Sequence, residues 1–223
     1  MSALPEDLFP PPIDGLLKAL SDSGFFERSL LIGSWVMPIY QELYGVRYVL
    51  RTFDVDFAVS LAHPRKKLRQ DLEHLITDLG FIDFIGTDGT QKFTAGGYEV
   101  EFIAHRPGGR DIGTLPVGEW NLNAMPLPFI NILTDFSETA DFGQGSIRFP
   151  APEAYFLHKL IIAPRRLTAE KRGKDLEQCA AIAPIIERQK LLAIMGAQRF
   201  GKATRTAMNS SCDAIGFPLH AGQ

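Results

Sequence analysis

The chain has 223 residues, of which 45% are hydrophobic and 22% charged, and its formal net charge is −3. This composition is typical of a soluble globular protein with one large domain or two small ones. The slight negative charge argues against a protein that coats nucleic acid non-specifically, although a local basic patch stays compatible with it.

Two cysteines, Cys179 and Cys212, are too few for a disulfide framework and lack the spacing of metal ligands. We therefore expect a reducing, cytoplasmic setting. The segment 1–7 is acidic and interrupted by a proline, which is not typical of a signal peptide. No apolar run approaches the ~20 residues that cross a bilayer, so we expect no membrane association.

A short strand between two helices is predicted near the N-terminus. Apolar residues recur at helical spacing in 13–20 and again in 36–43, and the apolar run 30–32 lies between them. Gly33 and Ser34 follow that run directly, on a predicted strand-to-helix turn. There a glycine lets a phosphate approach the backbone, and the start of the helix offers free N–H groups. Alone, such a pair is weak evidence, because most such pairs are ordinary turns.

Segment 46–59 is predicted to form one strand, or two with a break near Arg51 and Thr52. Apolar residues alternate with Asp54 and Asp56, so both carboxylates leave the same face, about 7 Å apart. Such neighbours repel each other unless cations bind between them, and Mg²⁺ prefers oxygen ligands of this kind. An isolated Asp-x-Asp is also common on the solvated face of an edge strand.

The chain between this strand and residue 150 contains mostly short predicted elements. We expect a helix over 68–79, strands over 81–85, 91–94, 98–103, 129–133 and 146–149, and an irregular connection over 106–128.

A β-hairpin is predicted around Gly96 and Gly97, and its second strand carries Glu99 and Glu101 on one face. If that strand packs beside the aspartates, a glutamate there would complete a metal-binding cluster, although outward-facing acids are common on hairpins. We expect Glu101 to be the third acid, because its neighbours are apolar, whereas Glu99 lies nearer to the turn.

From Pro150 onward the pattern is helical, which predicts one domain over 1–149 and a helical domain over 150–223. The first helix is expected to bury the face formed by residues 154, 157, 160 and 161. Lys159 lies outside that face. A third helix is expected over 186–197, and the tail from about residue 203 is expected to be loosely ordered.

Thr168 is predicted to cap the second helix of this half. Helical spacing there separates a buried side from an exposed side. We expect the buried side to hold Leu176, Cys179, Ala180 and Ala183, and the exposed side to hold Lys171, Lys174, Asp175 and Gln178.

The order of these motifs resembles the DNA polymerase beta-like nucleotidyltransferase superfamily, and most closely its small bacterial members of the abortive-infection toxin type. The resemblance implies a mixed α/β (α+β) sheet with flanking helices, followed by a helical C-terminal part. It covers about residues 33–178 and is carried by Gly33-Ser34, the segment 51–57 with its Asp-x-Asp, Val100-Glu101-Phe102, Lys159-Leu160, Arg165-Arg166 and the segment 171–176.

The resemblance also implies roles for individual residues. Gly33 and Ser34, with Arg51 and Thr52 beside the acidic strand, would hold the triphosphate. Catalysis would involve Asp54, Asp56 and Glu101 as ligands of two Mg²⁺ ions, and Lys159, Lys174 and Asp175 as residues facing the nucleotide. Nucleotidyl transfer fits these residue types, because two metals activate the attacking hydroxyl and steady the leaving pyrophosphate, while lysines offset negative charge.

Three functions are compatible with the sequence. The first is transfer of a nucleoside monophosphate from an NTP to a hydroxyl of RNA such as tRNA, of a protein, or of a small molecule. For a toxin-type member, a cognate antitoxin or partner protein is expected. The second is a catalytically silent nucleotide-binding or interaction module on the same fold. The third is a metal-dependent hydrolase, which the scattered histidines disfavour.

Overall fold

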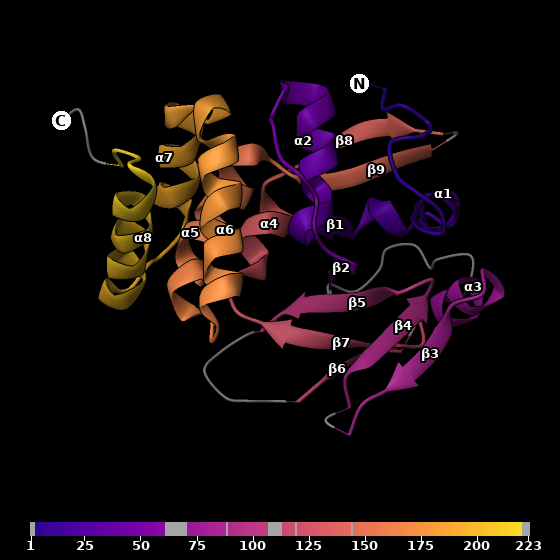
Figure 1. The fold of residues 1–223 in the computed structure, drawn as a ribbon. Coiled ribbons are helices and arrows are strands. Elements are labelled where there is room, and N and C mark those ends of the chain that lie inside the picture. The colour runs from indigo at the N-terminus through magenta and orange to yellow at the C-terminus, as the bar shows by residue number, and fades with distance from the viewer. Residues whose placement is uncertain are drawn as a thin grey trace. The chain divides into compact units, whose positions relative to one another are not determined.

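The computed structural model describes residues 3–60, 71–87, 89–106, 113–118, 120–143 and 145–219. The chain forms two compact units. The first, called here the sheet unit, comprises 1–39 and 50–150, and the second, the helical unit, comprises 40–49 and 151–223. Together their elements make a mixed α/β fold with a mixed sheet, flanking helices and C-terminal helices (Figure 1).

The sheet unit holds nine strands among the described residues. They are β1 (Leu30–Ile32), β2 (Asp54–Val59), β3 (Ile82–Ile85), β4 (Gln91–Ala95), β5 (Tyr98–His105), β6 (Leu115–Val117), β7 (Leu122–Leu127), β8 (Ser137–Phe142) and β9 (Gly145–Pro150).

The described residues form eight α-helices. They are α1 (Ile13–Asp22), α2 (Met37–Tyr44), α3 (Leu72–Asp78), α4 (Ile130–Asp135), α5 (Pro152–Ile162), α6 (Ala169–Ile182), α7 (Arg188–Ala197) and α8 (Lys202–Ile215). Short 3₁₀ turns are η1 (Phe25–Glu27), η2 (Gly33–Val36), η3 (Ala163–Arg165) and η4 (Ala183–Ile185).

The large sheet has the strand order β1-β2-β5-β4-β3, and β7 with its partner β6 also joins β5. Strands β2 and β5 run parallel, whereas β4 and β5 form the predicted antiparallel hairpin. Its turn residues Gly96 and Gly97 both have positive φ, at 57° and 86°, as a type I′ hairpin turn requires. Strands β8 and β9 form a separate two-stranded sheet.

One face of the large sheet is entirely apolar at its centre. Alternate residues of β2, β4 and β5 point to this face, and Phe57, Phe93 and Phe102 are buried there. Phe57 and Phe102 stack with their ring centroids 5.6 Å apart, and Phe25 of η1 packs edge-on against both rings. This aromatic cluster fixes which side of β2 and β5 is left for the charged residues.

The opposite face of the same sheet is divided into two halves. Toward the carboxyl ends of β2 and β5, Ala58 and Ile103 pack with Leu30 of β1 under Ile130 and Leu133 of α4. Toward the amino ends, the same face carries acidic residues in place of apolar ones. Because α4 covers only the apolar half, the acids lie just beyond the edge of a packed core.

In the helical unit α5 is buried on nearly all sides and contacts α6, α7 and α8. This is a wider burial than the single apolar face that the sequence predicted. Helix α8 contradicts the expected loosely ordered tail, because Thr204, Met208, Ser211 and Cys212 line a face that packs against α5.

Other departures concern short segments. Residues 130–135 form helix α4 rather than the predicted strand 129–133, and the expected irregular connection contains β6 and β7. Regular strand structure in 46–59 begins only at Asp54. The first part of the helix predicted over 68–79 lies outside the described residues, which resume before α3.

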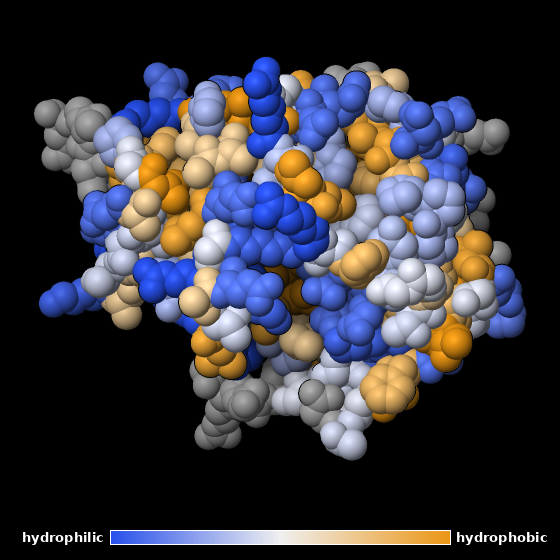
Figure 2. Space-filling model, in the orientation of Figure 1, coloured by the Kyte–Doolittle hydropathy of each residue, from blue (hydrophilic) through white to orange (hydrophobic). Residues whose placement is uncertain are grey.

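Hydrophilic and hydrophobic residues are interspersed on the face shown in Figure 2. Among the described residues, no helix combines the length and the apolar character that crossing a membrane requires.

Candidate functional site

Asp54 and Asp56 lie on β2, in the acidic half of the sheet face described above. In the parallel register of β2 and β5, Asp54 is opposite Glu99 and Asp56 is opposite Glu101. The predicted juxtaposition of the Asp-x-Asp strand with the hairpin acids is therefore present. Register partners share a face, so four carboxylates project from two neighbouring strands.

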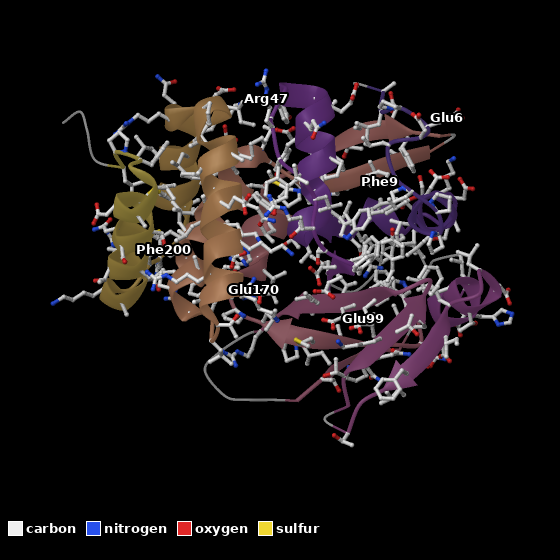
Figure 3. All side chains as sticks on the ribbon, viewed as in Figure 1. Glu6, Phe9, Arg47, Glu99, Glu170 and Phe200 are labelled. Atoms are coloured by element: carbon white, nitrogen blue, oxygen red, sulfur yellow. The ribbon has the colours of Figure 1, made fainter. Side chains whose placement is uncertain are left out.

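The four acids differ in exposure. Asp54 is exposed and Asp56 is half-buried. Of the two glutamates, Glu101 has 18% of its side chain exposed and Glu99 has 43%. Figure 3 labels Glu99 on β5. The deeper position of Glu101 agrees with the expectation that its apolar neighbours would draw it into the sheet.

Gly33 brings the first motif to the same place. It follows β1 and has a φ of +68°, a conformation that side-chain-bearing residues rarely adopt. A Cβ at Gly33 would overlap the Asp56 carboxylate, and it would lie 3.2 Å from the Asp56 Cγ. Ile32, the preceding residue, is the register partner of Asp56. The strand-to-helix turn thus reaches the second aspartate directly.

The turn continues as the 3₁₀ segment η2, which leads into α2. Ser34, the second residue of the predicted phosphate turn, is 7% exposed. Its predicted role at the phosphates remains a prediction.

Arg51 and Thr52 precede the acidic strand. The Thr52 Oγ1 accepts a hydrogen bond of 3.2 Å from the Asp54 backbone N–H. The Glu99 backbone N–H donates to the Phe53 carbonyl at 3.0 Å, which extends the parallel pairing by one residue. These two bonds fix the backbone directly before β2, and the bond to Thr52 positions the Asp54 backbone. Arg51 is exposed.

Lys92 of β4 is a cation on the acidic face that was not assigned to the site from the sequence. It is the register partner of Glu101. Its Nζ lies 2.6 Å from Glu101 Oε1 and 2.8 Å from Glu99 Oε2. The hydrogen bond to Glu101 has the largest effect on the pKa of Lys92 and the bond to Glu99 the next largest. Both hold this pKa well above its ordinary value. Lys92 therefore carries a full positive charge throughout the physiological range.

The hairpin itself contained the signal for Lys92. With Gly96 and Gly97 as a two-residue turn, counting back along the two strands places Lys92 opposite Glu101. The count needs only the turn position, because a two-residue hairpin loop fixes the register.

The donor chemistry of Asp54 and Asp56 fits a hard divalent cation, since both offer carboxylate oxygens from one face of one strand. Glu101 stands beside Asp56 but is engaged with Lys92. Within the described part of the chain, no three His, Cys, Asp or Glu side chains are grouped so that they could hold a metal ion. The residues thus fit a metal held by the two aspartates.

The other predicted residues lie in the helical unit, where they form a buried ionic group. Lys159 Nζ of α5 lies 2.6 Å from Asp175 Oδ1 of α6, and the two side chains are 6% and 3% exposed. Arg166 Nε lies 2.6 Å from Asp175 Oδ2. Burial raises the pKa of Asp175, but the charges of Lys159 and Arg166 outweigh it, and the net pKa lies below the ordinary value.

This pairing corrects two expectations. Lys159 and Asp175 were both expected on exposed helix faces, yet each is buried because it neutralises the other. Gln178 was also expected on the exposed side of its helix. It is fully buried, where its Oε1 accepts from the Tyr155 hydroxyl at 2.9 Å and its amide donates to the Tyr48 hydroxyl at 3.2 Å.

The buried side of α6 is consequently formed by Asp175, Gln178, Cys179 and Ile182. Ala180, which was expected on the buried side, is exposed. The predicted cap of this helix is confirmed, because Thr168 Oγ1 accepts from the Lys171 backbone N–H at 3.3 Å. Lys174 is half-buried at the first turns of the helix.

His158 and Cys179 are buried beside this group. Burial, with a smaller effect from the Lys159 charge, lowers the pKa of His158 to about 3. Burial also raises the pKa of the Cys179 thiol. His158 is therefore neutral and Cys179 protonated at neutral pH, which suits packing residues and not nucleophiles.

The segment 165–174 of the helical unit is largely exposed and rich in basic residues. Its residues are exposed from Arg165 to Gly173, and Leu167 is fully exposed. Five of its ten residues are basic and one is acidic, which is Glu170. The segment offers several positive charges to a phosphate-bearing molecule.

Two comparisons with known proteins found similarities. A family model described as nucleotidyltransferase matches residues 13–199. A crystal structure of an antigenic nucleotidyltransferase-like protein from Paracoccidioides brasiliensis is similar at 14% identity, with a TM-score of 0.48, over 90% of this chain and 88% of that chain. No curated protein matches the sequence.

Proposed function

Because the chain belongs to the nucleotidyltransferase family, we propose that it transfers a nucleoside monophosphate from an NTP to a hydroxyl acceptor with the aid of Mg²⁺. The observation that carries this proposal is the meeting of Gly33 with Asp56, at the point where Asp54, Asp56 and Glu101 share one sheet face. The proposal is supported because a glycine turn, which a phosphate can approach, lies against carboxylates of the type that bind Mg²⁺.

In this proposal Asp54 and Asp56 hold the metal. When bound there, Mg²⁺ neutralises phosphate charge and lowers the pKa of an attacking hydroxyl. The two carboxylates would hold Mg²⁺ and still let it bind a nucleotide, because Mg²⁺ at nucleotide sites is usually held by one or two carboxylates. The asymmetry in exposure, with Asp54 open and Asp56 half-buried, gives substrate access from the side of Asp54.

The turn after β1 orients the triphosphate. Gly33 has no Cβ, so backbone N–H groups of the turn are accessible to phosphate oxygens while the Asp56 carboxylate stays in place. Arg51, exposed just before the acidic strand, supplies a guanidinium suited to bidentate phosphate contacts. Thr52 acts indirectly, because its hydroxyl positions the Asp54 backbone.

In this proposal the acceptor is a molecule that carries a hydroxyl group. The basic segment 165–174 supports a phosphate-bearing acceptor such as RNA, which is also what the resemblance to toxin-type members implies. Lys174 belongs to this segment and is the residue of the helical unit that we assign to phosphate contact. Lys159 and Asp175 act as positioning residues, because they are buried against each other.

A second candidate, a nucleotide-binding module without catalysis, is favoured by one observation. Glu101, the third acid, is already neutralised by Lys92 at 2.6 Å. If a free third carboxylate is needed for transfer, the chain would bind NTP and release it unchanged. The two candidates predict the same nucleotide binding and differ only in the product.

The test uses the purified chain, Mg²⁺ and each of the four NTPs labelled at the α-phosphate, with total cellular RNA, total cellular protein or neither. Label in RNA or protein, absent when EDTA is added, supports the enzyme and identifies its acceptor. Saturable NTP binding by calorimetry with no labelled product under any condition supports the silent module. Absence of both binding and transfer would contradict either function.

A further inference from the structure

The position of Lys92 bears on how many metal ions the site takes. Across the sheet, Asp56 on β2, Glu101 on β5 and Lys92 on β4 are successive register partners and form one row. Neighbouring strands lie about 4.8 Å apart, so the Lys92 backbone is about 10 Å from that of Asp56. The ammonium group extends toward β5, since it lies 2.6 Å from Glu101 Oε1.

Both glutamates bind the same ammonium group. Lys92 Nζ donates to Glu99 Oε2 at 2.8 Å in addition to its contact with Glu101. An ammonium group has three N–H donors, so two of them are used on the sheet. Because 33% of the Lys92 side chain is exposed, the ammonium group stays accessible to a ligand on the acidic face.

A divalent ion and this ammonium group compete for Glu101. A metal bound to the Glu101 carboxylate would lie within a few ångströms of a full positive charge that is itself held by two carboxylates. Asp54 and Asp56 lie on β2, on the far side of β5 from Lys92.

We propose that Lys92 is a fixed cation that takes the place of a divalent ion at Glu101, so that the site binds a single metal ion, at Asp54 and Asp56. Lys92 supplies the second positive charge of the site, and its third N–H is directed to a phosphate oxygen of the nucleotide. This inference rests on the proposed function for its ligand, but the metal count can be measured without any transfer reaction.

The experiment counts Mn²⁺ bound per chain by electron paramagnetic resonance, on metal-free protein without nucleotide. The wild type is expected to bind one Mn²⁺, and Lys92→Gln two. Combining Lys92→Gln with Glu101→Gln is expected to return the count to one, because the gained ion uses the freed glutamate. Glu101→Gln alone is expected to keep the single ion of the wild type.

Lys18→Gln is the matched control. Lys18 is also an ion-paired lysine of the sheet unit, 2.9 Å from Asp14 within α1, and its side chain is 38% exposed. This variant is expected to bind one Mn²⁺. Lys92→Arg, which keeps the charge, is also expected to bind one. Lys92→Met replaces Lys92→Gln if circular dichroism shows that the latter does not fold.

Two results would overturn the inference. One is a single Mn²⁺ in the folded charge-removing variant of Lys92, which is Lys92→Gln or its replacement Lys92→Met. The other is a wild type that binds two ions and loses one on Glu101→Gln. Asp56→Asn separates this from the proposed function: if it binds Mn²⁺ as the wild type does, the metal is not at the aspartates and both proposals fall. Loss of binding in Asp56→Asn with an unchanged count in the Lys92 variants refutes only the role of Lys92.

Discussion

Gly33 lies so close to Asp56 that any side chain at position 33 would overlap the aspartate carboxylate. The sequence suggested glycine at this turn because a phosphate must approach the backbone. The structure adds a second reason, because the glycine also leaves room for a candidate metal ligand on the neighbouring strand. One residue type thus satisfies two geometric requirements at one point.

Gly33→Ala is therefore expected to lower the free energy of unfolding. The positive φ alone costs a residue with a Cβ about 1–2 kcal/mol, and displacement of Asp56 adds to it. Urea unfolding followed by circular dichroism measures the loss. Gly15→Ala is the control, because Gly15 lies within α1 with no atom near its Cβ position, and alanine there should stabilise the helix by about 1 kcal/mol.

The overlap itself can be isolated by a double variant. If the Asp56 carboxylate causes part of the loss, Gly33→Ala should cost less in an Asp56→Ala background than in the wild type. Equal costs in both backgrounds would show that Gly33 is needed for its backbone conformation alone.

The hairpin and the Asp56–Glu101 pairing could be predicted from the sequence because both depend on local patterns. In 53–59 and 98–103, apolar residues alternate with charged ones, which assigns each side chain to the buried or the charged face of the sheet. The Gly-Gly turn fixes the register of the two hairpin strands. The strand predicted over 129–133 was wrong for a physical reason. A short apolar run has no decisive period, and here Phe129, at a φ of 67°, starts a helix that packs onto the sheet.

The buried ion group could not be read from helical spacing. Lys159 lies on α5, Asp175 lies on α6, and Arg166 lies in the link between η3 and α6. Each is polar enough to predict an exposed position. Their burial depends on tertiary packing that brings the charges together. The same holds for α8, where polar residues such as Asn209 and Ser210 remain exposed while the opposite side packs on α5.

Lys159→Met is expected to lower the free energy of unfolding by about 3 kcal/mol, because Asp175 would remain buried with one of its two partners missing. Lys174→Met, in the half-buried lysine next to Asp175, should change it by no more than about 0.5 kcal/mol. Thermal and urea unfolding measure both. Equal stability losses would contradict the assignment of Lys159 as a positioning residue and of Lys174 as a phosphate contact.

His158 is expected to make stability depend on pH. Its folded pKa of about 3 lies below the ordinary 6.5, so the unfolded chain binds a proton that the folded chain does not. The stabilisation is complete above pH 6.5 and is lost as pH falls toward 3, by up to about 1.4 kcal/mol per pH unit. His158→Leu should flatten this slope in urea titrations between pH 7 and pH 4.

The control for that titration is His74→Gln, which changes a histidine exposed on α3. A His158→Leu variant that keeps the full wild-type slope would show that other groups carry the acid sensitivity.

Asp54→Asn is expected to raise the melting temperature in metal-free buffer by about 1–2 °C, because Asp54 lies opposite Glu99 and like charges repel across a strand pair. Saturating Mg²⁺ should raise the melting temperature of the wild type and leave that of the variant nearly unchanged, since binding to the folded state alone stabilises it. Differential scanning fluorimetry with and without Mg²⁺ measures both effects. Equal stabilisation of the two proteins by Mg²⁺ would place the metal elsewhere.

The central claim is that Asp54 and Asp56 hold the metal for nucleotidyl transfer, and its most direct test is the transfer rate of Asp56→Asn. The assay follows label from an α-labelled NTP to its acceptor at saturating Mg²⁺. Asp83→Asn is the control, because Asp83 lies on β3 of the same sheet and asparagine keeps an oxygen for its bond from Gln91. We predict that Asp56→Asn loses transfer at least about a hundredfold while it stays folded, and that the control keeps the wild-type rate. Wild-type transfer by Asp56→Asn would contradict the account.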